Sequence, residues 1–320
     1  MFTMLLMTLL LAEDKIPSRP VHTYSIVAYD ETTGEVGAAV QSHWFSVGAS
    51  VIWVEPGVGA VATQSFLNVD YGPQGLAAMK AGGKPADVVK RLTDADQGRD
   101  VRQLAMVDIH GNVTGYTGAK CIDYACDAQG SGFSVQANIM LKDTVCAAMV
   151  KAYEGSKGKP LAERLMAALN AAQNEGGDLR GKQSAAIRVC KAKASERPWR
   201  DVVMELRVED HADPIGELNR LVAVHRAYTY MDEGDVHVEH GNIDKAMEAY
   251  GKAVAMLPGR MEPIYWQAVN LVGVKRMDEA LPMFKKVFAA EPNWRKMTAR
   301  LVKVGLLPKD PEIIDAINSL

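Results

Sequence analysis

The chain has 320 residues, of which 48% are hydrophobic and 23% are charged, and its formal net charge is −3. This composition is that of an ordinary globular protein, and the length is sufficient for two domains. The weakly acidic balance excludes the strongly basic surface that is typical of nucleic-acid-binding proteins, so we expect no nucleic-acid partner.

The N-terminal residues 1–12 read MFTMLLMTLLLA and are apolar apart from two threonines. This run is too short to span a bilayer, which takes about 20 apolar residues. We interpret residues 1–22 as a signal peptide, cleaved near Ala12, and a linker over residues 13–22. The protein is therefore expected in the periplasm or outside the cell, without a stable membrane span after signal removal. A cytoplasmic location is the alternative.

Four strands are predicted in the segment that follows. Their residues are mostly β-branched, aromatic or small, and turn residues such as Gly34, Pro56 and Gly57 separate them. Because the runs are almost continuously apolar, we expect them to be buried on both faces. These strands are residues 23–29, 36–41, 50–54 and 58–64.

The next part of the chain alternates blocks of helices with blocks of strands. This order is typical of an α+β protein and not of alternating βαβ units, and two sheets stacked between helical layers would bury the apolar strands. Helices are predicted at residues 74–81, 85–93, 142–153 and 161–174. Strands are predicted at residues 103–109, 113–117, 132–140, 184–190 and 202–208, with a loop over residues 118–131.

The four cysteines form no CxxC or zinc-binding pattern. Cys121 and Cys126 are close enough in sequence to form a disulfide across the predicted loop in an oxidising compartment. Four reduced, buried thiols are the alternative.

From residue 213 onward the pattern is helical and contains a repeat with a period of 34 residues. The small, aromatic and proline positions of this repeat match the tetratricopeptide (TPR) pattern, in which small residues let two helices approach and proline ends the second helix. The repeated positions are Gly234, Ala246, Tyr250 and Pro258, followed by Ala268, Ala280, Phe284 and Pro292.

We therefore predict an all-α domain of TPR helical hairpins over residues 213–320, with repeats at about 227–260 and 261–294. A helix at residues 214–225 and the tail at residues 295–320 are expected to cap the stack. A protein partner is expected in the concave groove of the repeats.

Thr23 is the candidate nucleophile, because it is the first residue of the first predicted strand. A hydroxyl residue at a chain N-terminus can use its own α-amine, with a pKa of about 8, as general base. This chemistry requires cleavage of the His22–Thr23 bond, which signal removal near Ala12 does not provide, so a second, autocatalytic cleavage is needed. The alternative is a threonine selected only for its β-propensity.

Other polar residues at strand ends are candidates for binding a substrate. His43 could orient a substrate or transfer protons, and Asn138 could donate to an oxyanion. Gln64 and Asn68 offer further donors and acceptors. Each of them is alternatively a structural hydrogen-bonding or capping residue.

A glycine-rich segment at residues 176–184 carries Asp178, Arg180 and Gln183. Arg180 could hold a substrate carboxylate through two hydrogen bonds, and an Asp178–Arg180 surface turn is the alternative. The sequence has no nucleotide-binding glycine motif, and His237 and His240 lack further ligands. We therefore expect no cofactor and no metal site.

Five motifs, in order, resemble the DUF1028 family over about residues 23–213. They read HTYSIVAYD, GAAVQSH, GVGAVATQS, QANIM and GGDLRGKQSAA. The resemblance implies a domain at residues 23–212 with the four-layer αββα sandwich of the Ntn-hydrolase-like superfamily, and it places the superfamily's N-terminal nucleophile at Thr23. Proteasome-type relatives carry an acid and a lysine in the next strands, whereas this chain has Gln41 and no matching lysine.

Two functions follow as hypotheses. The first is an exported amidohydrolase that acts on a small amide or peptide-like substrate through Thr23 and Asn138. The substrate would be positioned by His43, Gln64, Asn68, Asp178, Arg180 and Gln183. The second is a catalytically silent ligand-binding or assembly module, and self-association into a homo-oligomer is compatible with both.

Overall fold

The structure is a computed structural model that describes residues 23–320. The chain divides into two compact units, one ending at Asn219 and the other running from Arg220 to Leu320. The boundary expected after residue 212 lies shortly before this division. The predicted signal peptide and linker at residues 1–22 lie outside the described residues.

The N-terminal unit contains two antiparallel sheets, with strand orders β10-β9-β2-β1-β8-β7 and β3-β4-β5-β6 in its described part. The six-stranded sheet comprises β1 (Thr23–Asp30), β2 (Glu35–Ser42), β7 (Cys126–Gly130), β8 (Phe133–Ala137), β9 (Ser184–Lys191) and β10 (Val202–Val208). The four-stranded sheet comprises β3 (Ile52–Glu55), β4 (Gly59–Ser65), β5 (Arg102–Asp108) and β6 (Val113–Thr117).

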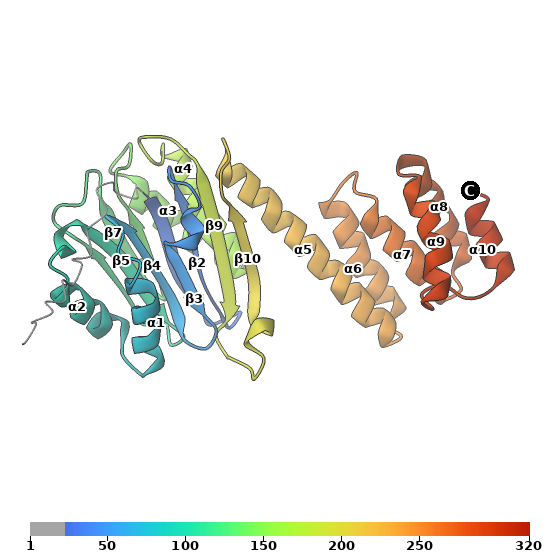
Figure 1. Cartoon of the computed structure of the whole chain (residues 1–320), viewed down its shortest axis with the longest axis horizontal. Helices are drawn as coiled ribbons and strands as arrows, with labels where there is room; N and C mark the ends of the chain where they lie inside the picture. The colour runs from blue at the N-terminus through green and yellow to red at the C-terminus, as the bar shows by residue number, and fades with distance from the viewer. Residues whose placement is uncertain (1–22) are drawn as a thin grey trace, which may run out of the picture. The chain divides into compact units, whose positions relative to one another are not determined.

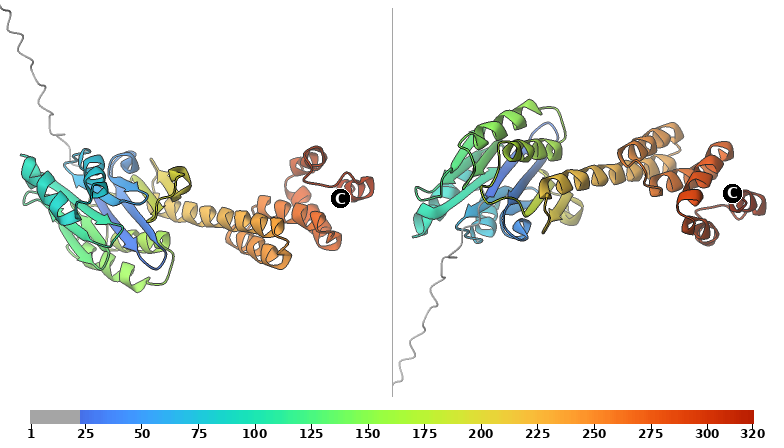
Figure 2. Two further views of the ribbon diagram at one scale, coloured as in Figure 1. Left: turned by 90° about the horizontal axis from the view of Figure 1, so that it is seen from below. Right: turned by 90° about the horizontal axis from the view of Figure 1, so that it is seen from above.

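The two sheets stack face to face, and helices cover their outer faces (Figure 1). Helices α1 (Tyr71–Lys80) and α2 (Pro85–Ala95) pack on the four-stranded sheet. Helices α3 (Val145–Gly155) and α4 (Leu161–Asn174) pack on the six-stranded sheet. Figure 2 shows the strands between these two helical layers from two further sides. The predicted α+β class is confirmed.

β1 shows why the strands are almost continuously apolar. Val27 faces the other sheet, in a core with Val40 and Val54, whereas Tyr24 on the opposite face reaches Gln173 of α4. Both faces of the strand are therefore covered, and seven of its eight residues are buried, as its nearly continuous apolar sequence predicted.

The predicted loop at residues 118–131 is wrong in part, because it contains β7. The sequence of β7, CDAQG, has low intrinsic β-propensity. It becomes a strand because it pairs in antiparallel register with β8, from Cys126 opposite Ala137 to Gly130 opposite Phe133. Pairing with a neighbour, and not local sequence, decides its conformation.

The predicted Cys121–Cys126 disulfide is also wrong, as is the alternative of four thiols. Cys126 pairs with Cys146, at a Cα–Cα distance of 6.2 Å, whereas Cys121 and Cys190 are free thiols. Because Cys126 begins β7 and Cys146 lies in the first turn of α3, the bond ties an edge strand to the helix that covers it.

The C-terminal unit is helical. Its helices are α5 (Pro214–Glu239), which begins in the N-terminal unit, α6 (Ile243–Met256), α7 (Glu262–Gly273), α8 (Met277–Ala290), α9 (Asn293–Lys303) and α10 (Pro311–Asn318). The helix expected at residues 214–225 continues without a break into the first repeat, because no glycine or proline lies between Gly216 and Gly234. None of the described helices is both long and apolar enough to span a bilayer.

Small residues allow close helix contacts in this unit. A Cβ atom added at Gly234 of α5 would lie 2.7 Å from the ring of Tyr250 in α6. That ring is fixed, because its hydroxyl is hydrogen-bonded to Asp235 and Asn270. Gly251 of α6, by contrast, has no atom within 4 Å of its added Cβ.

Alanine substitutions at these two glycines should therefore have opposite effects. Gly234→Ala should lower the free energy of unfolding of the helical unit by about 1–3 kcal/mol, because the methyl group overpacks the contact with Tyr250. The matched control Gly251→Ala should raise it by about 0.5–1 kcal/mol through helix propensity. Chemical denaturation followed by circular dichroism measures both, and equal stabilisation by both variants would contradict the packing role of Gly234.

A buried ion pair fastens β1 to α4. The Arg164 guanidinium lies 2.5 Å from the Asp30 carboxylate and stacks over the Tyr153 ring, and the Asp30 side chain is 7% exposed. Burial alone would raise the pKa of Asp30, but the hydrogen bond from the Thr32 N–H and the Arg164 guanidinium together lower it. The ion pair therefore contributes stability above the ordinary carboxyl pKa of about 4, and this contribution is lost as the pH falls through the lowered pKa.

We expect Asp30→Asn to lower the free energy of unfolding by about 3 kcal/mol at pH 7, because it leaves the Arg164 charge buried without its partner. The deficit should begin to shrink as the pH falls below about 4, where the carboxylate of the unfolded wild type takes up a proton, and should be smallest below the lowered pKa of the folded state. Asp94→Asn, which breaks the exposed Lys90–Asp94 pair, is the control and should cost less than about 0.5 kcal/mol. A pH-independent deficit would contradict the assignment.

Candidate functional site

Thr23 is the first residue of β1, is fully buried, and lies on the same face of the strand as Val27, toward the four-stranded sheet. Its hydroxyl donates to Ser42 Oγ on β2 at 3.3 Å. Its carbonyl oxygen accepts hydrogen bonds from the backbone N–H of Asn138 and from Gln64 Nε2, both at 3.1 Å. Donors from both sheets therefore hold the first residue of β1 in place.

Gln103 of β5 is the centre of the hydrogen bonds around Thr23. Its Oε1 accepts from Gln64 Nε2 at 2.7 Å and from Asn138 Nδ2 at 2.9 Å. Its Nε2 donates to Thr117 Oγ1 and to the Ala137 carbonyl oxygen, both at 2.9 Å. One buried amide thus connects β4, β5, β6 and β8.

Ser25 and Gln136 extend these bonds along β1. Ser25 Oγ donates to Gln64 Oε1 at 2.5 Å and accepts from Gln136 Nε2 at 2.7 Å. Every member of this group is fully buried, so its amides and hydroxyl need partners within the protein, and they find most of them in one another. Asn138 Oδ1 has no hydrogen-bond partner among the described residues. We call the group of Ser25, Gln64, Gln103, Gln136 and Asn138 the polar cluster.

The polar cluster is neutral. Amide and hydroxyl side chains donate and accept hydrogen bonds but do not titrate near neutral pH. A carboxylate joins the hydrogen-bond chain at its outer end, where Asp127 accepts from Thr117 Oγ1 at 2.5 Å. The cluster can orient a carbonyl oxygen or stabilise an oxyanion, but it supplies no general base next to Thr23.

Two residues with positive φ flank the end of β1 that carries Thr23. Ile139, directly after Asn138, has φ of 57°, and Ser65, the last residue of β4, has φ of 69°. A β-branched residue adopts this conformation only where its surroundings impose it. Ile139 is held by hydrogen bonds from its own N–H to the Ile122 carbonyl and from the Leu179 N–H to its carbonyl. The backbone here is shaped by neighbouring loops.

A second group of predicted residues lies around Asp178. The Asp178 carboxylate is fully buried and accepts from the His43 N–H at 3.1 Å and from the Arg180 N–H and Nη2 at 2.9 Å. The Arg180 guanidinium therefore pairs with a carboxylate of its own loop. The pKa of Tyr24 is raised well above its ordinary value, mainly by burial and to a smaller extent by the negative charge of Asp178.

Gln41 is a polar residue near the end of β2. It is opposite Tyr24 in the β1–β2 register, so both residues face α4. Its side chain is fully buried, and neither amide atom has a partner among the described residues. Gln41 therefore belongs to the face of the sheet that carries Tyr24, whereas Thr23 lies on the other face.

The structure thus separates the predicted site residues. Thr23, Gln64 and Asn138 lie together between the sheets, whereas His43, Asp178 and Arg180 form a group at the neighbouring loop. Asn68 accepts from Thr63 Oγ1 through its carbonyl and from the Asp70 N–H through its side chain. Gln183 donates from its side chain to Asp210 and from its N–H to the Ser42 carbonyl.

Three residues of the polar cluster were not predicted: Ser25, Gln103 and Gln136. Each is a polar residue next to an apolar residue inside a strand, in TYSIVAYD, RQLAMVD and FSVQA. Buried polar side chains need partners, so polar residues in several mostly apolar strands indicate a shared network. The sequence contained this signal, but it did not indicate which strands lie next to one another.

Three cavities lie in other parts of the structure, and Thr23 lines none of them. Among the described residues, no three histidine, cysteine or acidic side chains lie together as metal ligands would. Thr23 is 0% exposed. The polar cluster is therefore an enclosed group and not the wall of an open cleft.

Comparison with known proteins identifies the N-terminal unit. Residues 23–218 match the model of DUF1028, described as a family of unknown function. The chain belongs to the DUF1028 family. The DUF1028 region thus runs from β1 into the start of α5. It contains the polar cluster and the loop with Asp178 that connects α4 to β9.

A solved structure carries the same family assignment. It is the crystal structure of protein SPO2555 from Silicibacter pomeroyi, which shares 30% sequence identity with this chain, with a TM-score of 0.55. The match covers 63% of this chain and 88% of that protein. No curated protein matches the chain.

Gln103→Ala should be among the most destabilising single substitutions in the DUF1028 region. It removes the acceptor of Gln64 and Asn138 and leaves their donors buried, at a cost of about 1–3 kcal/mol for each unsatisfied group. We expect a total loss of about 3 kcal/mol or more in chemical denaturation. Gln129→Ala, at an exposed position of β7, is the matched control and should change stability by less than about 0.5 kcal/mol. A loss at Gln103 as small as at Gln129 would contradict the central role of Gln103.

Proposed function

We propose that this protein is an exported Ntn-type amidohydrolase that acts on a small amide or peptide-like substrate, with Thr23 as its nucleophile. The observation that carries the proposal is the position of Thr23. It is the first residue of β1, with its hydroxyl beside Ser42 and its carbonyl oxygen fixed by Asn138 and Gln64. Catalysis requires a nucleophile held in one orientation, and these bonds supply that restraint.

In the proposed reaction, cleavage of the His22–Thr23 bond frees the α-amine of Thr23. Thr23 Oγ1 then attacks the substrate carbonyl carbon while the α-amine accepts the hydroxyl proton. The tetrahedral oxyanion is stabilised by neutral donors, for which Asn138 Nδ2, 3.5 Å from the Thr23 carbonyl oxygen, is the candidate. The amine leaves with the proton, and water hydrolyses the acyl-threonine ester by the reverse proton path.

The loop around Asp178 is the proposed substrate-positioning element. It adjoins the end of β1 that carries Thr23, because the Gln183 N–H donates to the Ser42 carbonyl and the Leu179 N–H to the Ile139 carbonyl. A substrate that approaches Thr23 from this end would meet His43 and Arg180, which belongs to the same loop as Asp178. In this role Asp178 orients Arg180 and does not itself bind the substrate.

The remaining parts of the proposal rest on the architecture. The order helix, sheet, sheet, helix supports assignment to the Ntn-hydrolase-like superfamily. The Cys126–Cys146 disulfide supports export, since such bonds persist in oxidising compartments. The contacts of Gly234 with Tyr250 and of Tyr265 with Phe284 support TPR-type hairpins that bind a protein partner.

The alternative is a catalytically silent module for ligand binding or assembly. It is favoured by the complete burial of Thr23 and by the neutrality of the polar cluster. In this case the hydrogen bonds of Thr23 only stabilise the sheet, and the helical unit provides recognition.

Intact-mass analysis of protein purified from its native host separates the two functions. The enzyme should begin at Thr23, and Thr23→Ala should retain the preceding residues and lose amidase activity by about a thousandfold or more. Thr23→Ser is the matched control, because it keeps a hydroxyl and should still be processed. A mature start near residue 13 in both the wild type and Thr23→Ala, with unchanged activity, would support the silent module.

A further inference from the structure

The two sheets leave an open side along β3 and β10. β3 is the edge strand of the four-stranded sheet, and it lies against β9 and the short 3-10 helix η1 (Val47–Ala49). β10 is the outermost strand of the wider sheet, next to β9. Side chains on the inner faces of β9 and β10 therefore line the mouth between the sheets.

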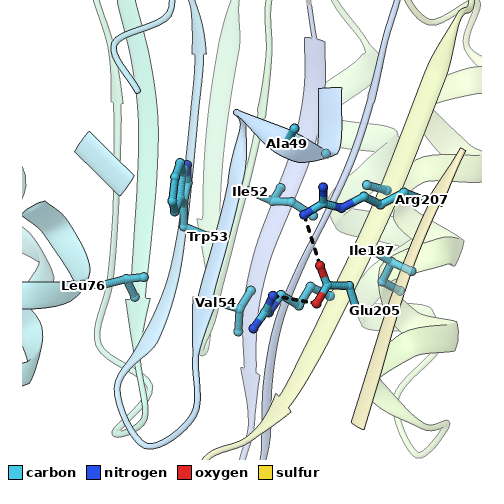
Figure 3. Close-up of a pocket in the computed structure, with 11 residues that line it drawn as sticks. Ala49, Ile52, Trp53, Val54, Leu76, Ile187, Glu205 and Arg207 are labelled. Atoms are coloured by element: carbon cyan, nitrogen blue, oxygen red, sulfur yellow. Dashed lines mark hydrogen bonds and ion pairs between the residues drawn. The ribbon is translucent and has the colours of Figure 1, made fainter. Parts of the chain in front are cut away.

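Three charged residues lie at this mouth, next to the apolar part of the inter-sheet core. Arg188 of β9 faces inward with Ala186 and Cys190, two residues of the inter-sheet core. Its Nη1 lies 2.6 Å from the Glu205 carboxylate of β10, and Nη2 of Arg207 lies 3.1 Å from the other carboxylate oxygen. Figure 3 shows Glu205 between the two guanidinium groups.

We call Arg188, Glu205 and Arg207 the triad, and their charges do not balance. Two guanidinium groups share one carboxylate, which leaves one positive charge at the mouth. The Arg188 Nε is buried and has no hydrogen-bond partner among the described residues. A guanidinium presents its donors in a planar fork that fits a carboxylate, so a second carboxylate would complete both the charge and the hydrogen bonds.

Arg188, Glu205 and Arg207 line a cavity of about 200 Å³. Ile52 and Val54 of β3 (Figure 3) contribute apolar side chains to it, together with Ala186 of β9. At roughly 30 Å³ for each water molecule in the liquid, this volume is that of a chain of a few carbon atoms. A cavity lined by both charged and apolar side chains has the features of a site for a small amphipathic molecule.

We propose that this cavity binds a short-chain monocarboxylic acid. Its carboxylate pairs with Arg188 and Arg207, and its alkyl chain lies against Ile52 and Val54. The site is separate from Thr23, because Arg188 is about 13 Å along β9 from Ser184, the residue in register with Ser42. The proposal therefore holds whether or not Thr23 is a nucleophile.

Isothermal titration calorimetry of the full chain with acetate, butyrate and hexanoate tests the proposal. We expect saturable binding to one site, with affinity increasing about threefold to fourfold for each added methylene group until the cavity is filled. The neutral butyramide and the cationic butylamine are the ligand controls and should not bind at the same concentrations. Equal binding of butyrate and butyramide, or no saturable binding of any acid, would overturn the proposal.

Substitutions at Arg207 and Glu205 should change the affinity for butyrate in opposite directions. Arg207→Gln should weaken butyrate binding at least tenfold, because it removes a charged hydrogen-bond donor. Glu205→Gln should tighten it, because the competing carboxylate is gone. Arg200→Gln, at an exposed position of the β9–β10 connection, is the matched control and should leave the affinity unchanged.

Far-UV circular dichroism confirms the fold of each variant, and Arg207→Lys is the substitute if Arg207→Gln does not fold. Lysine keeps the charge but loses the planar fork, so binding should weaken by several-fold and remain measurable. If the triad is only a structural ion pair, the variants of Arg207 and Glu205 will bind butyrate as the wild type does, and the proposal fails.

Discussion

The structure of the DUF1028 region depends on one constraint: polar side chains buried between two sheets must satisfy one another. Gln103 meets this constraint for Gln64 and Asn138, and through them for the carbonyl oxygen of Thr23. Such a network is stable only in one register of the strands, because a shift by one residue would turn every side chain to the other face. The same hydrogen bonds therefore fix the sheet register and the position of the candidate nucleophile.

β1 divides the predicted site into two groups with different surroundings. Thr23 and Ser25 face the other sheet, whereas Tyr24 faces α4, near Asp178. The first group is neutral and enclosed, and the second contains a buried carboxylate with its arginine. Two adjacent residues of one strand thus reach different chemical environments, which a linear list of polar residues does not reveal. A reaction at Thr23 would use the first group for the oxyanion and the second for the substrate.

The class of the fold and most of its strands and helices could be predicted from the sequence, because apolar periodicity is a local property. Of the candidate site, Thr23, Gln64 and Asn138 were predicted as site residues, and the structure brings them together. Gln103 was missed because its role depends on the pairing of β4 with β5 and on the stacking of the sheets. The Cys126–Cys146 bond was missed for the same reason, since β7 and α3 meet only in three dimensions. Local signals do not encode such long-range contacts.

The Cys126–Cys146 bond has a further consequence. It closes a covalent ring over a sequence separation of 20, and β8 lies inside that ring with Gln136 and Asn138. A cross-link of this length restricts the unfolded chain at an entropic cost equivalent to about 3 kcal/mol. These two residues would therefore remain within a tethered loop even when the surrounding sheet opens. Transfer of the chain to a reducing environment would release this tether at Cys126, whose carbonyl oxygen is one of the acceptors of Gln103.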